Sequence, residues 1–259
     1  MTATITVSAS TSARRMLASP GALFFGVVFA PLVVSVISAL WRAAADASGG
    51  TIAGYSARSV TWYLVTSEAS ILCIPTRLIE ETGDAIGSGA VTAELLRPQP
   101  PVIIRMALEA GASFVKLCSM LPVLLVLAVV TVGAPPSVGA LALAVPSLVL
   151  AALCNIAGQH VVSAVAFWLR DATSAWFLYQ KAVFLLGGML IPLEALPHGL
   201  GVAARCLPFA AMAYAPARIA SGHIEPYLLV TQAAWLLALV VGARVAFAAG
   251  ERRLTGAAS

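Results

Sequence analysis

The sequence predicts an all-α membrane protein with six transmembrane helices. Of its 259 residues, 60% are hydrophobic and only 10% are charged, and the mean hydropathy is +0.95. A soluble domain has about 25% charged residues, so this composition excludes both a soluble globular protein and a disordered chain. The apolar stretches are continuous and suit helices of ~20 residues that cross a bilayer, whereas a transmembrane barrel would have short alternating segments. We therefore expect one transmembrane domain over residues 1–259.

Charged and helix-breaking residues separate the six expected spans. The charge-free stretch from Leu117 to Leu169 is too long for one helix, and Gly133-Ala134-Pro135-Pro136 within it predicts a turn. Pro192 ends the fifth span, because proline cannot continue a helix. The expected helices cover about 16–41, 59–76, 106–132, 138–165, 174–192 and 226–244.

The distribution of arginines predicts the topology. An even number of spans places both termini on one side, and basic residues concentrate on the cytoplasmic side of membrane proteins. With the termini in the cytoplasm, eight arginines lie inside and four lie outside. The inside set is Arg14, Arg15, Arg77, Arg97, Arg105, Arg170, Arg252 and Arg253, and the outside set is Arg42, Arg58, Arg205 and Arg218. We therefore expect cytoplasmic termini.

Motifs for catalysis are missing from the sequence. There is no phosphate-binding G-x-x-x-x-G-K-[ST] motif, and neither lysine, Lys116 or Lys181, follows a glycine. The zinc-protease motif H-E-x-x-H is also absent. Glu80 and Glu81 resemble the start of a paired-glutamate intramembrane protease motif, but Ala85 stands where that motif needs arginine. We expect no enzymatic activity, cofactor or metal site in this chain itself.

Polar side chains within the expected spans are candidates for a substrate pathway, because ionisable groups inside a membrane are costly. Glu68 lies near the middle of the second span, and Asn155, Gln159 and His160 cluster on the fourth. The alternative for each is a structural hydrogen bond between helices. Glu109, Lys116 and Lys181 are expected to extend toward water along their aliphatic stems.

The segment between the second and third spans predicts a short amphipathic helix. Acidic residues recur at Glu80, Glu81 and Asp84, and Ile79 and Ile86 are seven residues apart, with glycines following. An anionic leaflet would repel these carboxylates, so they suit a partner protein with basic residues. The alternative is a solvated loop.

The segment from the fifth to the sixth span is too apolar for a free loop and too rich in proline for a span. Short helices that enter the membrane and return fit both properties, provided that they pack against protein or line a wet cavity. The residues that mark this outer segment are Pro192, Pro197, Pro208, Phe209, Tyr214 and Pro216.

The order and spacing of these motifs resemble the ABC-2 type exporter permeases, in particular a bacterial six-helix branch whose genes often occur as permease pairs. The resemblance covers about residues 80–225. The matching residues are Ile86, Gly89, Leu95, Leu96, Arg97, Pro98, Phe167, Trp168, Gly188, Pro192, Leu193, Pro197, Leu207, Pro208, Phe209, Tyr214, Pro216 and Gly222.

The resemblance implies a transport complex in the bacterial inner membrane. Two permease chains, identical or different, would form the pathway, and two cytoplasmic ABC ATPase subunits would bind ATP and Mg²⁺ and drive transport. Segment 79–98 would be the coupling helix, Arg170 and Asp171 a second docking point, and the outer segment a cap on the pathway. The coupling residues would be Glu80, Glu81, Asp84, Ile86, Gly89, Leu96, Arg97, Pro98, Arg170 and Asp171.

Two other functions fit parts of the sequence. A six-helix secondary transporter or channel would use Glu68 together with Asn155, Gln159 and His160 near the middle of the membrane. A structural membrane-assembly factor fits the apolar composition but leaves the acidic segment unexplained. Glu68 itself departs from the resemblance, which leads us to expect a neutral residue there.

Overall fold

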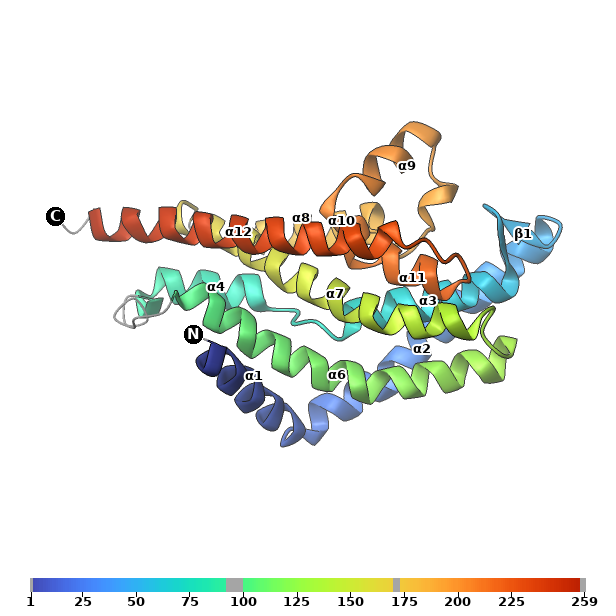
Figure 1. Cartoon of the computed structure of the whole chain (residues 1–259), viewed down its shortest axis with the longest axis horizontal. Coiled ribbons are helices and arrows are strands. Elements are labelled where there is room, and N and C mark those ends of the chain that lie inside the picture. Colours follow the sequence, from blue (N-terminus) through green and yellow to red (C-terminus); the bar gives the residue numbers. More distant parts are fainter. Residues whose placement is uncertain (1, 92–99, 170–172, 257–259) are drawn as a thin grey trace.

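The chain forms an elongated bundle of helices in the computed structural model, which describes residues 2–91, 100–169 and 173–256 (Figure 1). A two-stranded antiparallel hairpin lies at one end of the bundle. The start of α1, the end of α12 and helix α4 lie at the other end (Figure 1). The elements are α1 (Thr2–Leu17), α2 (Pro20–Ala47), β1 (Thr51–Ile52), β2 (Tyr55–Ser56), α3 (Ala57–Leu72), α4 (Leu78–Gly87), α6 (Pro101–Val132), α7 (Val138–Ser163), η1 (Ala164–Phe167), α8 (Thr173–Leu186), η2 (Leu193–Ala195), α9 (His198–Arg205), α10 (Pro208–Met212), α11 (Tyr214–Ala220) and α12 (Tyr227–Gly256).

Within the described residues, four helices are long and apolar enough to cross a membrane. They cover Gly26–Ala47, Pro101–Val132, Val138–Phe167 and Tyr227–Arg253. The remaining two of the six expected spans correspond to α3 and α8, which have 16 and 14 residues. Both are shorter than the ~20 residues that a straight helix needs to cross the hydrocarbon core. The composition therefore indicates an all-α membrane protein, and six complete spans stay a prediction.

The ends of α3 and α8 differ from the expected ranges for local reasons. α3 stops at Leu72 instead of continuing to residue 76, because Pro75 cannot donate a helical hydrogen bond. α8 stops at Leu186, well before Pro192. Gly188 follows with a φ of 71°, a left-handed conformation that favours glycine, so the chain turns one and a half turns of helix earlier than predicted.

The N-terminal helix α1 was not predicted, and the range 16–41 was wrong at both ends. The first long helix is interrupted at Ala18 and Ser19, and α2 begins at Pro20, a residue well suited to the first turn of a helix. α1 packs closely along α6: a Cβ atom added at Gly111 would overlap the backbone carbonyl group of Ala9. The absence of a side chain at Gly111 thus permits the contact.

Two central helices, α3 and α7, organise the bundle. Residues 60–70 of α3 are all buried, and α7 is buried along most of its length. Gln232 of α12 makes hydrogen bonds to two neighbouring helices, α7 and α10. Its Nε2 donates to the carbonyl oxygens of Ser147 and Ala211, at 3.0 and 2.9 Å. Its Oε1 accepts from the Ser147 hydroxyl at 2.8 Å. These bonds fix α12 against α7 and α10.

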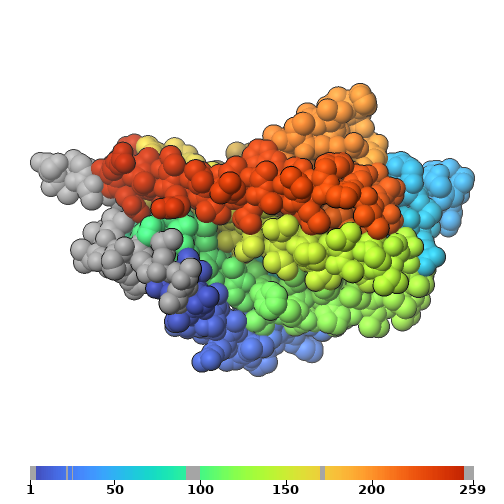
Figure 2. Space-filling model, viewed as in Figure 1, coloured from blue at the N-terminus to red at the C-terminus, as the bar shows by residue number. Residues whose placement is uncertain are grey.

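The outer segment folds into four short helical pieces, η2, α9, α10 and α11, as its prolines suggested. Each of three pieces begins at or directly after a proline, namely η2 after Pro192, α9 after Pro197 and α10 at Pro208. α9 stands out above α12 in the space-filling view (Figure 2), while α11 packs inward against α3 and α7. The segment therefore has one projecting part and one buried part.

We expect Gly111→Ala to destabilise the protein because the new methyl group must push α1 away from α6. Overpacking of this kind costs about 1–3 kcal/mol. Gly139→Ala is the matched control, since its Cβ would meet only the Ser137 hydroxyl at 3.7 Å. Thermal unfolding in detergent should show a lower Tm for the Gly111 variant alone. Equal Tm values in the two variants would contradict the close α1–α6 contact.

Candidate functional site

The short helix α4 presents a charged face and a buried face. Glu81 and Asp84 are exposed and lie one turn apart on the outer side. The helix is amphipathic, as the spacing of its isoleucines predicted. Its buried residues are Leu78, Ile79, Thr82 and Ile86. The helix therefore directs two carboxylates away from the bundle while its other side is fixed to the protein.

Packing and one hydrogen bond hold α4 in place. Ile86 belongs to a buried cluster with Phe167 of η1 and Phe247 of α12, whose rings meet edge to face at 5.5 Å. Arg105 of α6 donates from Nη1 to the Thr82 hydroxyl at 3.4 Å. Because these neighbours come from three different elements, α4 is attached to the bundle as one rigid unit.

A glycine follows the C-terminal end of α4, and its first turn contains an ion pair at the surface. Gly89, which follows the Ser88 cap, has a φ of 75°, the left-handed conformation that commonly ends a helix at glycine. Glu80 pairs with Arg77 at 3.5 Å, an exposed ion pair of little energetic weight. The other predicted coupling residues, Leu96, Arg97, Pro98, Arg170 and Asp171, lie outside the described residues.

The predicted polar cluster on α7 forms a buried hydrogen-bond network. Gln159 donates from Nε2 to Asn155 Oδ1 at 3.0 Å and to the carbonyl oxygen of Pro75 at 3.1 Å. The hydroxyl of Tyr179 in α8 also donates to Asn155 Oδ1, at 3.0 Å. His160 turns its Nδ1 toward the carbonyl oxygen of Ile156, 2.9 Å away. Asn155 thus joins α7 to α8, and Gln159 joins α7 to the connection between α3 and α4.

Glu68 is not part of this network. It is 1% exposed, and neither of its carboxyl oxygens has a hydrogen-bond partner among the described residues. The structure therefore places three of the four predicted pathway residues on α7, where only Asn155 and Gln159 are bonded to each other, and encloses the fourth, Glu68, on α3.

A second polar cluster, which we call the outer cluster, lies at the opposite end of the bundle and centres on Glu194 of η2. The Glu194 carboxylate accepts from the hydroxyls of Tyr55 and Tyr214, at 3.1 and 2.6 Å, and from Arg205 at 3.2 Å. Arg218 of α11 lies 3.5 Å from the same carboxylate and donates to the Tyr55 hydroxyl at 2.8 Å. Four separate elements therefore meet at one carboxylate.

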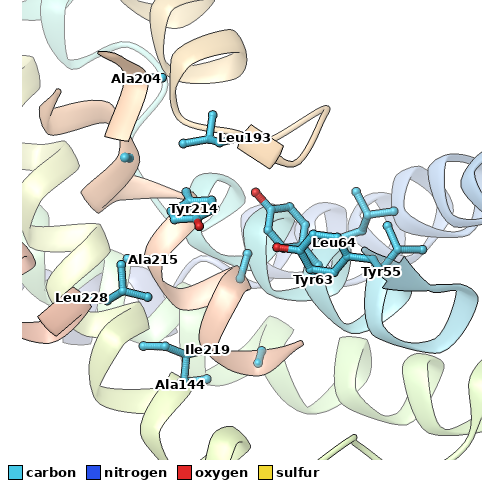
Figure 3. Close-up of a cluster of buried hydrophobic side chains, with 14 residues drawn as sticks. Tyr55, Tyr63, Leu64, Ala144, Leu193, Ala204, Tyr214, Ala215, Ile219 and Leu228 are labelled. Carbon is cyan, nitrogen blue, oxygen red and sulfur yellow. The ribbon is translucent and has the colours of Figure 1, made fainter. Parts of the chain in front are cut away.

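The aromatic rings of Tyr55, Tyr63 and Tyr214 pack against one another at the outer cluster. The hydroxyl ends of Tyr55 and Tyr63 point toward Tyr214 (Figure 3), and the Tyr55 and Tyr63 rings meet edge to face at 5.5 Å. The Tyr63 hydroxyl donates to the Gly188 carbonyl oxygen at 2.5 Å. Burial, together with the nearby Glu194 carboxylate, raises the pKa of Tyr55 and of Tyr214 above the usual tyrosine value. The hydroxyls accordingly stay protonated and act as donors.

Sequence reasoning found part of this cluster and missed its centre. Tyr214 was a predicted outer residue, and Pro192 and Pro197 bracket the turn that carries Glu194. Glu194 and Arg218 were not singled out. The signal that could have found them is a carboxylate and an arginine within an otherwise apolar segment, where charges need partners. Phe209 meets the Tyr179 ring at 6.1 Å, and Pro216 is buried within α11.

These features define an integral membrane protein built of helices, with a charged helix at one end and a polar cluster at the other. A family model described as ABC-2 family transporter protein matches residues 32–258, which is most of the chain. The chain belongs to this family and is an ABC-2 type permease, a membrane component of a transport system. None of the curated proteins compared with the chain matches it.

We expect Glu194→Ala to destabilise the outer cluster strongly. The substitution removes the acceptor for two tyrosines and leaves Arg205 and the half-buried Arg218 without this counter-charge, and leaving such partners unsatisfied typically costs about 1–3 kcal/mol. Glu225→Gln is the matched control, because Glu225 also pairs with Arg218 but lies outside the centre of the cluster and is more exposed. A smaller loss of Tm in the Glu194 variant than in the control would refute the central role of Glu194.

The outer cluster should also lose stability in mild acid because of His223. Partial burial and the positive charge of Arg218 lower the pKa of His223, while Glu225 and Glu194 oppose this shift more weakly. A lowered pKa means that the unfolded chain binds the proton better, so stability falls as pH drops below the unfolded value of ~6.5. The Tm difference between pH 7.5 and 5.5 should be smaller in His223→Gln than in the wild type. An unchanged difference would show that His223 does not contribute.

Proposed function

We propose that this chain is the transmembrane subunit of an ATP-driven exporter in the bacterial inner membrane. Two permease chains would form the substrate pathway, and two separate cytoplasmic ATPase subunits would bind ATP and Mg²⁺. Membership of the ABC-2 family supports the transport role. The observation that carries the rest is α4, a helix with one face fixed in the bundle and two carboxylates, Glu81 and Asp84, exposed on the other.

The acidic face of α4 is suited to docking on a protein that presents basic residues. Exposed ion pairs contribute only about 0.2–1 kcal/mol each, so the fit of the helix into a groove would supply most of the grip. Contacts with η1, α12 and α6 would pass a displacement of α4 to three parts of the bundle. ATP-driven closure of the ATPases could then shift the two permease chains between discrete packings.

The proposal also assigns the two ends of the bundle to the two sides of the membrane. The end of the bundle with α4 would face the cytoplasm together with both termini, and Leu96, Arg97 and Pro98 would complete the coupling segment. Arg170 and Asp171 would give a second docking point. At the other end, the short helices from η2 to α11 would re-enter the membrane and cap the pathway, with the outer cluster holding them to the hairpin.

A secondary transporter or channel is the second candidate, and Glu68 is the observation in its favour. A buried carboxyl group without a hydrogen-bond partner among the described residues is typical of functional positions in membranes. The network of Asn155 and Gln159 gives this candidate less support, because these residues bond to Tyr179 of α8 and to the carbonyl oxygen of Pro75 and so have a structural role. The family match favours the exporter subunit.

We expect Asp84→Arg to abolish most ATP-driven transport without unfolding the permease, because it places a positive charge against the basic surface of the ATPase. Asp46→Arg is the matched control: Asp46 is equally exposed but lies at the hairpin end of α2. Both variants should retain the helicity of the wild type. Full transport by Asp84→Arg, with normal association of the ATPase, would exclude α4 as the coupling helix.

The partnership itself can be tested by purifying the tagged chain from its native membrane in mild detergent. An ATP-hydrolysing subunit should co-purify with the wild type and the Asp46 variant and should be depleted from the Asp84 variant. A second permease chain of different sequence in the eluate would indicate a heterodimer. A chain that purifies alone, without ATPase activity, would favour the transporter or channel centred on Glu68.

A further inference from the structure

A groove with one polar and one apolar end lies between α2, α6 and the end of α3. Its volume is about 270 Å³, just below the range of ~300–1,000 Å³ common for small-molecule sites. The polar contributions come from Lys116 and Ser119 of α6 and from Thr76 after α3. The other lining residues are Leu23, Gly26, Phe29, Ala30, Leu72, Ile74 and Met120.

Packing between the helices shows where the polar end lies. A Cβ atom at Gly26 would be 3.2 Å from Met120 Sδ, so α2 and α6 touch there. Lys116 lies one helical turn before Met120, and Thr76, which lines the same groove, lies two residues before the start of α4 at Leu78. The polar end of the groove, with Lys116 and Thr76, is therefore on the side toward α4, while Ala30 of α2 and Leu72 of α3 belong to its apolar part.

The charge at this end of the groove is basic. Lys116 is half-buried and has no carboxylate within 4.0 Å among the described residues; Glu109, seven positions earlier on α6, interacts with it electrostatically but forms no ion pair with it. Arg14 and Arg15 are exposed in the last turn of α1, just before α2 contributes Leu23 to the groove. A half-buried ammonium group at a membrane boundary is costly without a counter-ion, and a phosphate would supply one.

We propose that the groove binds one anionic phospholipid of the leaflet on the α4 side. Lys116 contacts the phosphate, with Arg14 and Arg15 adding favourable potential, and an acyl chain lies in the apolar part beside Ala30 and Leu72. Basic pockets between helices on the cytoplasmic side are a recurrent form of anionic lipid recognition. The inference depends on the membrane location of the chain and is independent of any ATPase partner.

Native mass spectrometry of the full-length, delipidated protein in detergent tests this site. Phosphatidylglycerol and phosphatidylcholine are titrated separately onto the wild type, Lys116→Gln, Lys116→Arg and Lys181→Gln. Lys181 is the matched control, because it is the other lysine of the chain and lies on α8 beside Phe177 and Phe184. Loss of one basic side chain at a membrane surface should weaken phosphatidylglycerol binding about fivefold, and only Lys116→Gln should show this loss.

A steric variant tests the apolar part. Gly26→Leu fills the groove and should reduce phosphatidylglycerol binding, whereas Gly21→Leu, which has open space around it, should not. Circular dichroism confirms that each variant keeps its helicity. Equal binding of both lipids by the wild type would overturn the proposal, as would unchanged phosphatidylglycerol binding by folded Lys116→Gln. Competition by glycerol 3-phosphate as strong as that of the intact lipid would assign the site to a free phosphate instead.

Discussion

The burial of α3 on every side is the constraint on which the bundle depends. This helix of 16 residues packs against α2, α6, α7 and α11, so no face is left for polar groups that need solvent. Its hydroxyl residues meet this requirement within the helix. Thr61, Thr66, Ser67 and Ser70 all donate to backbone carbonyl oxygens three or four residues earlier. Small side chains with satisfied hydroxyls let four neighbours approach closely, as in other membrane bundles.

The two polar sites of the molecule lie at the two ends of this central helix. Tyr55 in β2, just before α3, and Tyr63 in the first half of α3 belong to the outer cluster and its aromatic support. Just beyond the other end, Pro75 accepts from Gln159 and the chain enters α4. α3 is therefore the shortest covalent connection between the outer cluster and the acidic face of α4. α7 also contacts both α4 and α11, so the two ends are connected through packing as well as along the chain.

The sequence was sufficient for the features that depend on periodicity and composition. The amphipathic α4 follows from the spacing of Ile79 and Ile86, and the broken outer segment follows from its prolines. Features that depend on close packing between segments distant in the sequence could not be predicted from it. Helix α1 has few large apolar residues and is held by the fit of Ala9 against Gly111. The outer cluster joins Tyr55 to Arg218 across 163 positions, and no local pattern records such a pairing.

Comparison of two buried polar residues shows what packing does and does not explain. Gln232 is enclosed by α7 and α10, and every bond of its amide described here joins helices, so the cost of burying it is offset by the contacts it makes. Glu68 is enclosed to the same degree but has no hydrogen-bond partner among the described residues. A buried carboxyl group without partners carries its full desolvation penalty. A leucine would avoid that penalty, so the packing of the described part of the chain gives no reason for a carboxyl group at this position.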